Sequence, residues 1–251
     1  MTGAEGPRAA GPTGPPELAA RLRAVRKRFG YRDVLRGIDL DVPRGSRFVI
    51  QGPNGAGKSS LLRVLSTQWT CTSGDVELLG MPVRSHSFEV KARLGIVFHE
   101  SFLRRELSLD ENMRFTCDLF GLNGDRVRAR TEDLLSRFQL AHRRRNPVGT
   151  FSQGMAKRAS IVRSLLHEPD VWLLDEPFSG LDRAGQALLE ELVREFTSKG
   201  GTAILVTHDG ARALRLATES VRIEDGLVTR RGPGAAAFDL GSAGDAEDVE
   251  A

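Results

Sequence analysis

The sequence contains few cysteines and no long apolar run. These two absences argue against a disulfide-rich protein and against a membrane-spanning one. Its two cysteines, Cys71 and Cys117, lie far apart and in no metal-binding spacing, so we expect reduced thiols in a cytosolic protein. No stretch approaches the roughly 18 apolar residues that span a bilayer, and the Pro/Gly-rich start lacks the apolar core of a signal peptide. The sequence therefore predicts a chain that neither crosses a membrane nor is secreted by that route.

The chain also has little excess charge of either sign. In 251 residues, 36 Lys and Arg stand against 33 Asp and Glu, which gives no electrostatic argument for nucleic acid as a partner. A chain of this length buries roughly 70 to 75% of its unfolded surface, so it forms a sizeable core without disulfides. Residues 1–17 are rich in Gly, Pro and Ala, and residues 231–251 end in an acidic run. Both segments are expected to be disordered tails.

One glycine-rich loop organises the rest of the sequence. An apolar run that favours a buried strand, residues 48–51, precedes it, and apolar positions at helical spacing follow it. This strand, loop and helix order is the context that a G-x-x-x-x-G-K-[ST] phosphate loop requires. Backbone N–H groups and the helix dipole would bind phosphates, Lys58 would reach the outer phosphates, and the Ser59 hydroxyl would ligate Mg²⁺. The loop consists of Gly52, Pro53, Asn54, Gly55, Ala56, Gly57, Lys58, Ser59 and Ser60.

The pattern of apolar residues changes along the chain. The front part predicts short strands at 22–29, 38–42, 48–51 and 75–79. A helical insert is expected over about 88–166, with helices at 109–120, 126–138 and 155–166. Buried strands at 171–174 and 203–207, joined by a helix at 183–197, favour a parallel sheet. A helix near 211–217 and a hairpin at 221–229, turned by Asp225-Gly226, complete the pattern.

Polar residues follow both buried strands of the second half. Because ligands bind at the carboxyl ends of parallel strands, we expect Asp175, Glu176 and His208 to converge on the glycine loop. Asp175 can hold Mg²⁺ opposite Ser59, and Glu176 can accept a proton from the water that attacks the terminal phosphate. Two acids at a strand end are otherwise an ordinary solvated turn. Their place beside a phosphate loop favours the catalytic interpretation.

A second candidate anion-binding end lies at residues 151–155. Phe-Ser-Gln-Gly-Met indicates a helix start with Ser152 as its N-cap. One triphosphate does not need two such helix ends. We therefore expect a dimer in which each copy offers this end to the nucleotide bound by the other.

The order of these motifs resembles the nucleotide-binding subunit of the ATP-binding cassette (ABC) transporter family. The phosphate loop, the signature at 151–155, the Walker B segment at 171–176, the Ser179-Gly180-Leu181-Asp182 loop and the Thr207-His208-Asp209 switch occur in family order over about 18–229. The resemblance implies an α/β fold over residues 18–230: a P-loop NTPase with a RecA-like core, an antiparallel β subdomain and the inserted α-helical subdomain. It also implies ATP and Mg²⁺ as cofactors.

The resemblance further assigns roles to single residues. Glu176 would be the general base, His208 would contact the γ-phosphate, and Asp182 would bridge the two copies. The signature, with Ser152 and Gly154, would close over the ATP of the partner. Phe29 matches the position that stacks on adenine, with Tyr31 as the rival stacker and a core phenylalanine as the plain alternative.

Two positions depart from the family pattern. The signature has Gln153 where the family has a glycine and Met155 where it has a glutamine, while its serine and second glycine remain. The strand at 94–97 leads to His99 and Glu100, where the family places a metal-contacting glutamine. Either residue could reach Mg²⁺ or the attacking water, or His99 could be merely a polar strand end.

The resemblance implies an ATP-hydrolysing motor that works with a separate membrane protein. In the family, the region 98–120 forms a groove for a short helix of an integral membrane subunit. The chain would then act as a homodimer, or as a heterodimer with a related ATPase, on the cytoplasmic face of the membrane. Its motifs look most like those of bacterial haem-exporter and cytochrome c maturation ATPases, and related polysaccharide and drug exporters share parts of the pattern. Two alternatives stay open: a soluble ATPase of an assembly or repair complex, and a nucleotide sensor that does not hydrolyse ATP.

Overall fold

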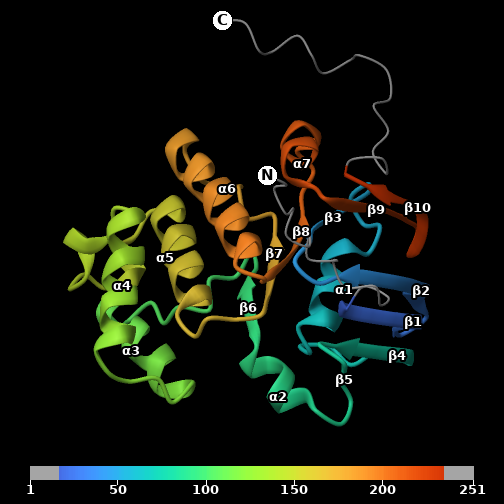
Figure 1. The fold of residues 1–251 in the computed structure, drawn as a ribbon, viewed down its shortest axis with the longest axis horizontal. Helices are drawn as coiled ribbons and strands as arrows, with labels where there is room; N and C mark the ends of the chain where they lie inside the picture. Colours follow the sequence, from blue (N-terminus) through green and yellow to red (C-terminus); the bar gives the residue numbers. More distant parts are fainter. Residues whose placement is uncertain (1–16, 235–251) are drawn as a thin grey trace, which may run out of the picture.

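Two β-sheets of different kinds organise residues 17–234, the part of the chain that the computed structural model describes (Figure 1). The expected tails therefore fall almost entirely outside the described residues. The first sheet is antiparallel, in the order β2-β1-β4-β5. The second has six strands in the order β10-β9-β3-β8-β7-β6, and its neighbours are parallel except for the pair β9 and β10.

The first two strands of the antiparallel sheet are longer than the sequence pattern predicted. Its strands are β1 (Leu18–Phe29), β2 (Arg32–Pro43), β4 (Ser73–Leu78) and β5 (Met81–Pro82). Ala24 has a φ of 48° and lies where the register between β1 and β2 shifts, between Leu22 and Val25. A further register shift, between Leu18 and Ala20, breaks the alternation of buried and exposed residues in the part of β1 that the apolar pattern missed.

The parallel sheet is covered on both faces, which explains its nearly continuous apolar strands. Its members are β3 (Arg47–Gln51), β6 (Leu94–Val97), β7 (Val171–Asp175), β8 (Thr202–Val206) and β9 (Glu219–Glu224) with β10 (Leu227–Pro233). Alternate residues point to opposite faces. Leu173 packs in one core with α1 (Lys58–Leu65) and the antiparallel sheet. Trp172 and Leu174 pack in a second core with the helices of the other face.

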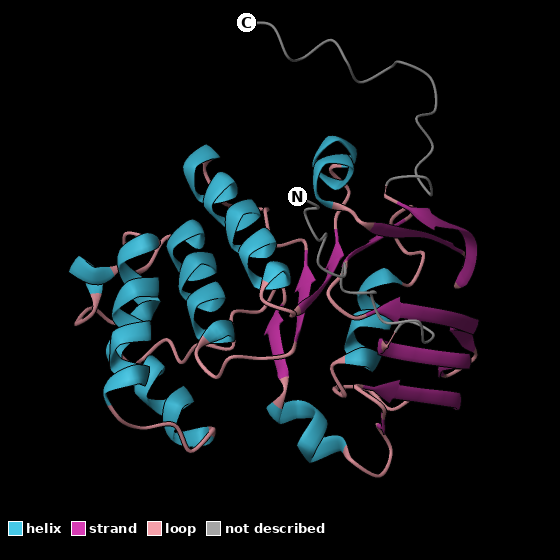
Figure 2. Ribbon diagram, in the orientation of Figure 1, coloured by secondary structure: helices cyan, strands magenta, loops and turns pink. Residues whose placement is uncertain are grey.

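Helices form the far layer of the second core (Figures 1 and 2). The expected helices are present as α3 (Leu109–Leu119), α4 (Asp125–Arg137), α5 (Gln153–Leu165) and α6 (Arg183–Ser198). Shorter helices are α2 (Ser87–Ala92) and the 3-10 helices η1 (Ala141–Arg143) and η2 (Val148–Thr150). Ser108 and Glu111 start α3 as a capping box. The segment 88–166 includes β6, which pairs with β7 in the parallel sheet, so this segment is not helical throughout.

The end of the described chain forms the hairpin that the sequence predicted. After α7 (Gly210–Leu216), β9 and β10 are joined by Asp225 and Gly226, whose φ angles of 47° and 75° are those of a type I′ turn. β10 continues to Pro233, past residue 231, where the tail was expected to begin. Among residues 17–234, no helix has the length and apolar character needed to span a bilayer.

Candidate nucleotide-binding and catalytic site

Three neighbouring parallel strands bring the candidate site together at their carboxyl ends. The sheet places β3, β8 and β7 side by side, so the segments that follow them lie next to one another, as the sequence predicted. Ser59 Oγ lies 3.1 Å from Asp175 Oδ1. His208 Nδ1 lies 2.9 Å from Glu176 Oε2. Residues from the glycine loop, from the end of β7 and from the end of β8 thus share one site.

The glycine loop has a backbone that only glycine adopts readily. Gly52 has a φ of 145°, and a Cβ added there would lie 1.9 Å from the carbonyl oxygen of Ile223 on β9. Gly57, at the N-cap of α1, has a φ of 103°. The loop therefore packs directly against the sheet and leads into the N-terminus of α1, where unpaired N–H groups favour an anion.

Lys58 is folded into the loop. Its side-chain Nζ donates to the carbonyl oxygens of Gly52, at 2.7 Å, and Pro53, at 2.9 Å. Burial lowers the pKa of Lys58, and the charges of Glu176 and Asp175 partly oppose this shift. These contacts hold the Lys58 ammonium group inside the glycine loop, where a phosphate would bind.

Ser59 and Asp175 supply oxygen ligands of the kind that Mg²⁺ prefers. Asp175 is buried, and burial raises its pKa, while the hydrogen bond from Ser59 and the charges of Lys157, Arg63 and Lys58 lower it. Within residues 17–234, no group of three or more His, Cys, Asp or Glu is placed to hold a metal ion. A hydroxyl and a single carboxylate fit Mg²⁺ that takes its other ligands from phosphates and water.

Glu176 has an unusual backbone for a non-glycine residue. Its φ is 43°, in the left-handed region, and its N–H donates to the carbonyl of Val206 on β8 at 3.0 Å. Such backbone strain costs on the order of 1–3 kcal/mol and gathers at functional sites. The exposed ring of His208 lies against the Glu176 carboxylate. The strained turn therefore holds this carboxylate beside the end of β8.

The structure separates the two residues at the end of β6. His99 lines a cavity of about 260 Å³ together with Lys157 and Ser179. Glu100 instead pairs with Arg63 of α1 at 3.4 Å. Among the described residues, no hydrogen bond or ion pair joins His99 or Glu100 to Asp175. A contact of His99 or Glu100 with Mg²⁺ therefore stays a prediction.

Lys157 was not predicted as a site residue. Its Nζ lies 3.4 Å from the carbonyl oxygen of Phe98. Burial lowers its pKa, and the charges of Asp175 and Glu176 raise it. The Lys157 ammonium group is therefore close enough to Asp175 and Glu176 for their charges to affect its pKa. The position of Lys157, two residues after the signature, was the only sign in the sequence.

The signature forms the N-terminus of α5. Ser152 caps this helix by accepting a hydrogen bond from the N–H of Met155 at 3.2 Å, and both Ser152 and Gln153 are exposed. A Cβ on Gly154 would lie 2.8 Å from the carbonyl oxygen of Gly180. The signature therefore packs against the 179–182 loop of its own chain. Within residues 17–234, no hydrogen bond joins Ser152 to the glycine loop.

Asp182 is engaged inside the chain. Its Oδ1 accepts from the N–H of Gly185 at 2.9 Å, which caps α6, and pairs with Arg158 of α5 at 2.6 Å. The hydrogen bond from Gly185 lowers the pKa of Asp182, and Arg158 adds to that effect. These contacts hold the start of α6 against α5. The expected bridge between two copies stays a prediction.

Phe29 lies at the end of β1 in an aromatic cluster. Its ring is 43% exposed and stands edge to face with Trp69 at 4.8 Å, with Lys27 Nζ 4.7 Å from its centroid. Tyr31 projects fully into solvent. Phe29 is thus the better held of the two candidate stackers, and its role stays a prediction.

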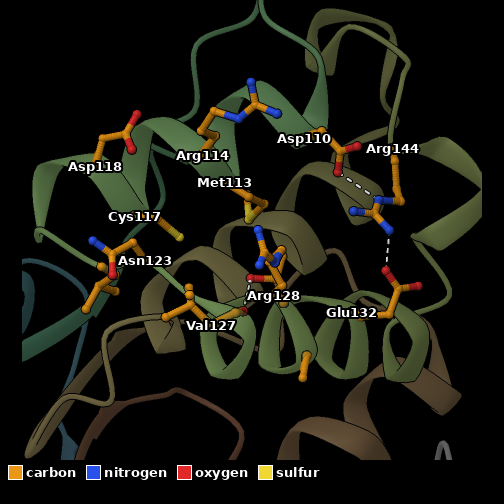
Figure 3. A pocket seen from close by; sticks show the side chains of 14 residues that line it. Asp110, Met113, Arg114, Cys117, Asp118, Asn123, Val127, Arg128, Glu132 and Arg144 are labelled. Atoms are coloured by element: carbon orange, nitrogen blue, oxygen red, sulfur yellow. Dashed lines mark hydrogen bonds and ion pairs between the residues drawn. The ribbon is translucent and has the colours of Figure 1, made fainter.

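A larger cavity lies away from the strand ends, between α3 and α4 (Figure 3). It has a volume of about 680 Å³. Arg144, on its rim, pairs with Asp110 at 2.8 Å and also with Glu132. Burial raises the pKa of the Cys117 thiol in the wall, so this thiol is a poor nucleophile. Asp110, Glu132 and Arg144 are thus paired with one another rather than directed at a ligand.

A family model described as ABC transporter matches residues 35–179, more than half of the chain. The chain therefore belongs to the ABC transporter family. A solved structure described as the ATP binding subunit of an ABC transporter is 27% identical and superimposes with a TM-score of 0.82, over 86% of this chain and 90% of the other. The expected α/β P-loop fold is confirmed. A dimeric ATP-binding cassette bound to ADP and phosphate shares the fold at 24% identity and a TM-score of 0.78, covering 85% of this chain and 98% of that one.

Two relatives indicate a branch of the family different from the one expected. The daunorubicin resistance ATP-binding protein DrrA3 of Streptomyces coeruleorubidus is 37% identical over 216 residues, 86% of this chain and 68% of the relative. The Nod factor export ATP-binding protein I of Ralstonia nicotianae is 34% identical over 211 residues, 84% of this chain and 66% of the relative. The chain thus spans about two thirds of each. The expected closeness to haem-exporter and cytochrome c maturation ATPases is not supported.

Proposed function

We propose that this chain is the ATP-hydrolysing subunit of an exporter, in which two copies close on two ATP molecules and drive a separate membrane subunit. The observation that carries the proposal is the meeting of Ser59, Asp175, Glu176 and His208 at the ends of β3, β7 and β8. Relatives named for drug resistance and Nod factor export support an exporter. Its substrate would be selected by the membrane subunit.

The glycine loop binds the phosphates in this proposal. Backbone N–H groups at the start of α1 contact phosphate oxygens, and Lys58 exchanges the carbonyls of Gly52 and Pro53 for the outer phosphates. Ser59 and Asp175 hold Mg²⁺, which neutralises phosphate charge when it is bound. Phe29 stacks on the base, and that stacking tolerates any base.

Glu176 and His208 act on the attacking water and the terminal phosphate. Glu176 accepts the proton of the water, and its left-handed backbone fixes the direction of its carboxylate. His208 contacts the γ-phosphate from the neighbouring strand end. The 2.9 Å contact between the two side chains supports a shared position around the reacting groups.

A second copy completes each site. Ser152 and Gln153 are exposed at the start of α5, and the hydrogen bond of Ser152 stays within that helix. This end is therefore free to meet the nucleotide of another copy, either the same chain or a related ATPase. Lys157 of the same helix lies with its Nζ 3.4 Å from the carbonyl oxygen of Phe98, just after β6, and so connects α5 to that strand end.

The membrane partner would bind near α3 at the cytoplasmic face. Large apolar side chains are exposed there: Phe102, Phe115 and Leu119. At about 100° per residue, Phe115 and Leu119 lie about 100° around α3 from Arg114 and Asp118, which line the larger cavity. This apolar surface, rather than the cavity, suits a short amphipathic helix of an integral membrane protein.

The experiment that tests the proposal compares Glu176→Gln with Glu89→Gln, a matched change at an exposed acid of α2. Glu176→Gln should lower phosphate release by on the order of 10²- to 10⁴-fold, the range for losing a general base. Binding of ATP, followed by titration calorimetry, should persist in both variants. Unchanged turnover in Glu176→Gln would overturn the assignment.

A further inference from the structure

Arg212 lies on α7, one turn after His208, and is the centre of a buried polar network. Its side chain is only 13% exposed. Its Nε lies 2.9 Å from Glu190 Oε1, its Nη2 donates to Gln186 Oε1 at 3.0 Å, and its Nη1 lies 3.4 Å from Asp209 Oδ2. A single planar guanidinium thus joins α6 to the switch segment through three separate groups.

The network reaches the segment that follows Glu176. The Arg212 guanidinium lies over the ring of Phe178, 4.4 Å from its centroid. Gln186, which accepts from Arg212, donates to the carbonyl of Leu181 at 3.0 Å and lies 3.4 Å from that of Phe178. Phe178 and Leu181 stand between Glu176 and Asp182 in the chain. Arg212 therefore supports the turn that connects Glu176 to Asp182.

The network also fixes the backbone around His208. Asp209 Oδ1 accepts from the N–H of Arg212 at 2.9 Å, and the N–H of Asp209 donates to Thr207 Oγ1 at 3.2 Å. His208 lies between these residues, and its side chain is 75% exposed. Because so little packing holds the imidazole itself, its direction depends on the backbone on either side.

We propose that Arg212 is a positioning residue that fixes the His208 loop relative to the turn carrying Glu176 and Asp182. It acts through Asp209 on one side and through Gln186, Glu190 and Phe178 on the other. This inference rests on the proposed ATP hydrolysis. Without the guanidinium, Glu190 loses its buried partner and the two segments lose their common connection.

Two neighbouring arginines provide a matched control. Arg215 and Arg194 also pair with Glu190, at 3.3 and 3.4 Å, but their side chains are about half exposed. Neither is near Phe178 or Asp209 in any described contact. If ion pairing with Glu190 were all that mattered, Arg215→Met would resemble Arg212→Met.

The test measures steady-state ATP hydrolysis by Arg212→Met, Arg212→Lys and Arg215→Met. Arg212→Met should lower kcat by about 10- to 100-fold, as expected when a reacting group is displaced by about 1 Å, and should leave KM for ATP within about twofold. Arg212→Lys, which keeps the charge but not the planar fork, should recover only part of kcat. Arg215→Met should match the wild type.

A double variant shows whether Arg212 acts through His208. In a His208→Ala background, adding Arg212→Met should lower kcat by less than about twofold, because the side chain being positioned is already absent. Loss of the full 10- to 100-fold in that background would overturn the inference, as would wild-type kcat in a folded Arg212→Met.

If Arg212→Met does not fold, Arg212→Lys is the variant that tests the inference, and a wild-type kcat in Arg212→Lys would overturn it. If wild type itself has no Glu176-dependent turnover, the proposed function fails instead.

Discussion

The Ser59 hydroxyl on α1 donates a hydrogen bond to Asp175 at the end of β7, across 3.1 Å. This bond connects the first helix after the glycine loop with a strand that enters the sheet more than a hundred residues later. It places a hydroxyl and a carboxylate at one point beside the candidate phosphate site.

Ser59→Ala should weaken ATP binding only when Mg²⁺ is present. Loss of the hydroxyl removes one metal ligand and leaves Asp175 without its donor, so the apparent affinity for Mg-ATP should fall at least about tenfold. Affinity for ATP in the presence of EDTA should stay the same. Titration calorimetry under both conditions makes the measurement, with Ser198→Ala on the exposed end of α6 as the control. An equal loss with and without Mg²⁺ would argue against a metal role.

Gly52→Ala should both destabilise the fold and abolish nucleotide binding. The added Cβ would lie 1.9 Å from the Ile223 carbonyl oxygen, so the loop must move away from β9. A backbone shift of this kind costs about 1–3 kcal/mol, in addition to the roughly 1–2 kcal/mol for an alanine with positive φ. Gly200→Ala separates the two effects, because Gly200 has a φ of 92° with open space around it. Urea unfolding of both variants makes the comparison, and equal losses would contradict the steric argument.

His167 should make the fold sensitive to mild acid. Its Nε2 lies 2.9 Å from the carbonyl oxygen of Leu94, its Nδ1 is buried without a partner, and the ring stacks on Phe120 at 3.9 Å. Burial lowers the pKa of His167 to about 4. An unfolded histidine has a pKa of about 6.5, so the unfolded chain binds the extra proton between pH 6.5 and 4. Stability is therefore lost as the pH falls through this window.

The His167 effect can be isolated by substitution. Between pH 7 and pH 5, this one group should reduce the free energy of unfolding by about 2 kcal/mol. His167→Gln, which can still donate to Leu94, should remove that part of the pH dependence, while exposed His142→Gln should not. Urea unfolding at the two pH values provides the comparison. An unchanged pH dependence in His167→Gln would show that the imidazole protonates freely in the folded state.

Local patterns predicted the parts of the site that depend on one segment or on sheet topology. Gly52 to Ser60 could be recognised because strand, loop and helix are contiguous in the sequence. Asp175, Glu176 and His208 could be placed together because parallel strands direct their carboxyl ends to one edge. These inferences need no knowledge of side-chain packing.

Other features depend on contacts between distant side chains. Tertiary packing of α5, α6 and α7 brings together two ion pairs, Arg212 with Glu190 and Arg158 with Asp182. No periodicity in the sequence distinguishes these two arginines from the others. The register shift between Leu18 and Ala20 hid the start of β1 for a related reason, since it breaks the alternation on which strand prediction depends. The branch of the family was also misjudged, because the motifs shared by all its members carry little information about cargo.

We propose that a second copy completes each nucleotide site, and Ser152→Asp in a Glu176→Gln background tests this proposal most directly. Aspartate still caps α5, but its charge would face the phosphates of the other copy. Sedimentation with saturating ATP should show a dimer for Glu176→Gln and a monomer for the Ser152→Asp double variant. Ser108→Asp, the same change at the N-cap of α3, should leave the dimer intact. A monomer in Glu176→Gln alone, or a dimer that survives Ser152→Asp, would contradict the account.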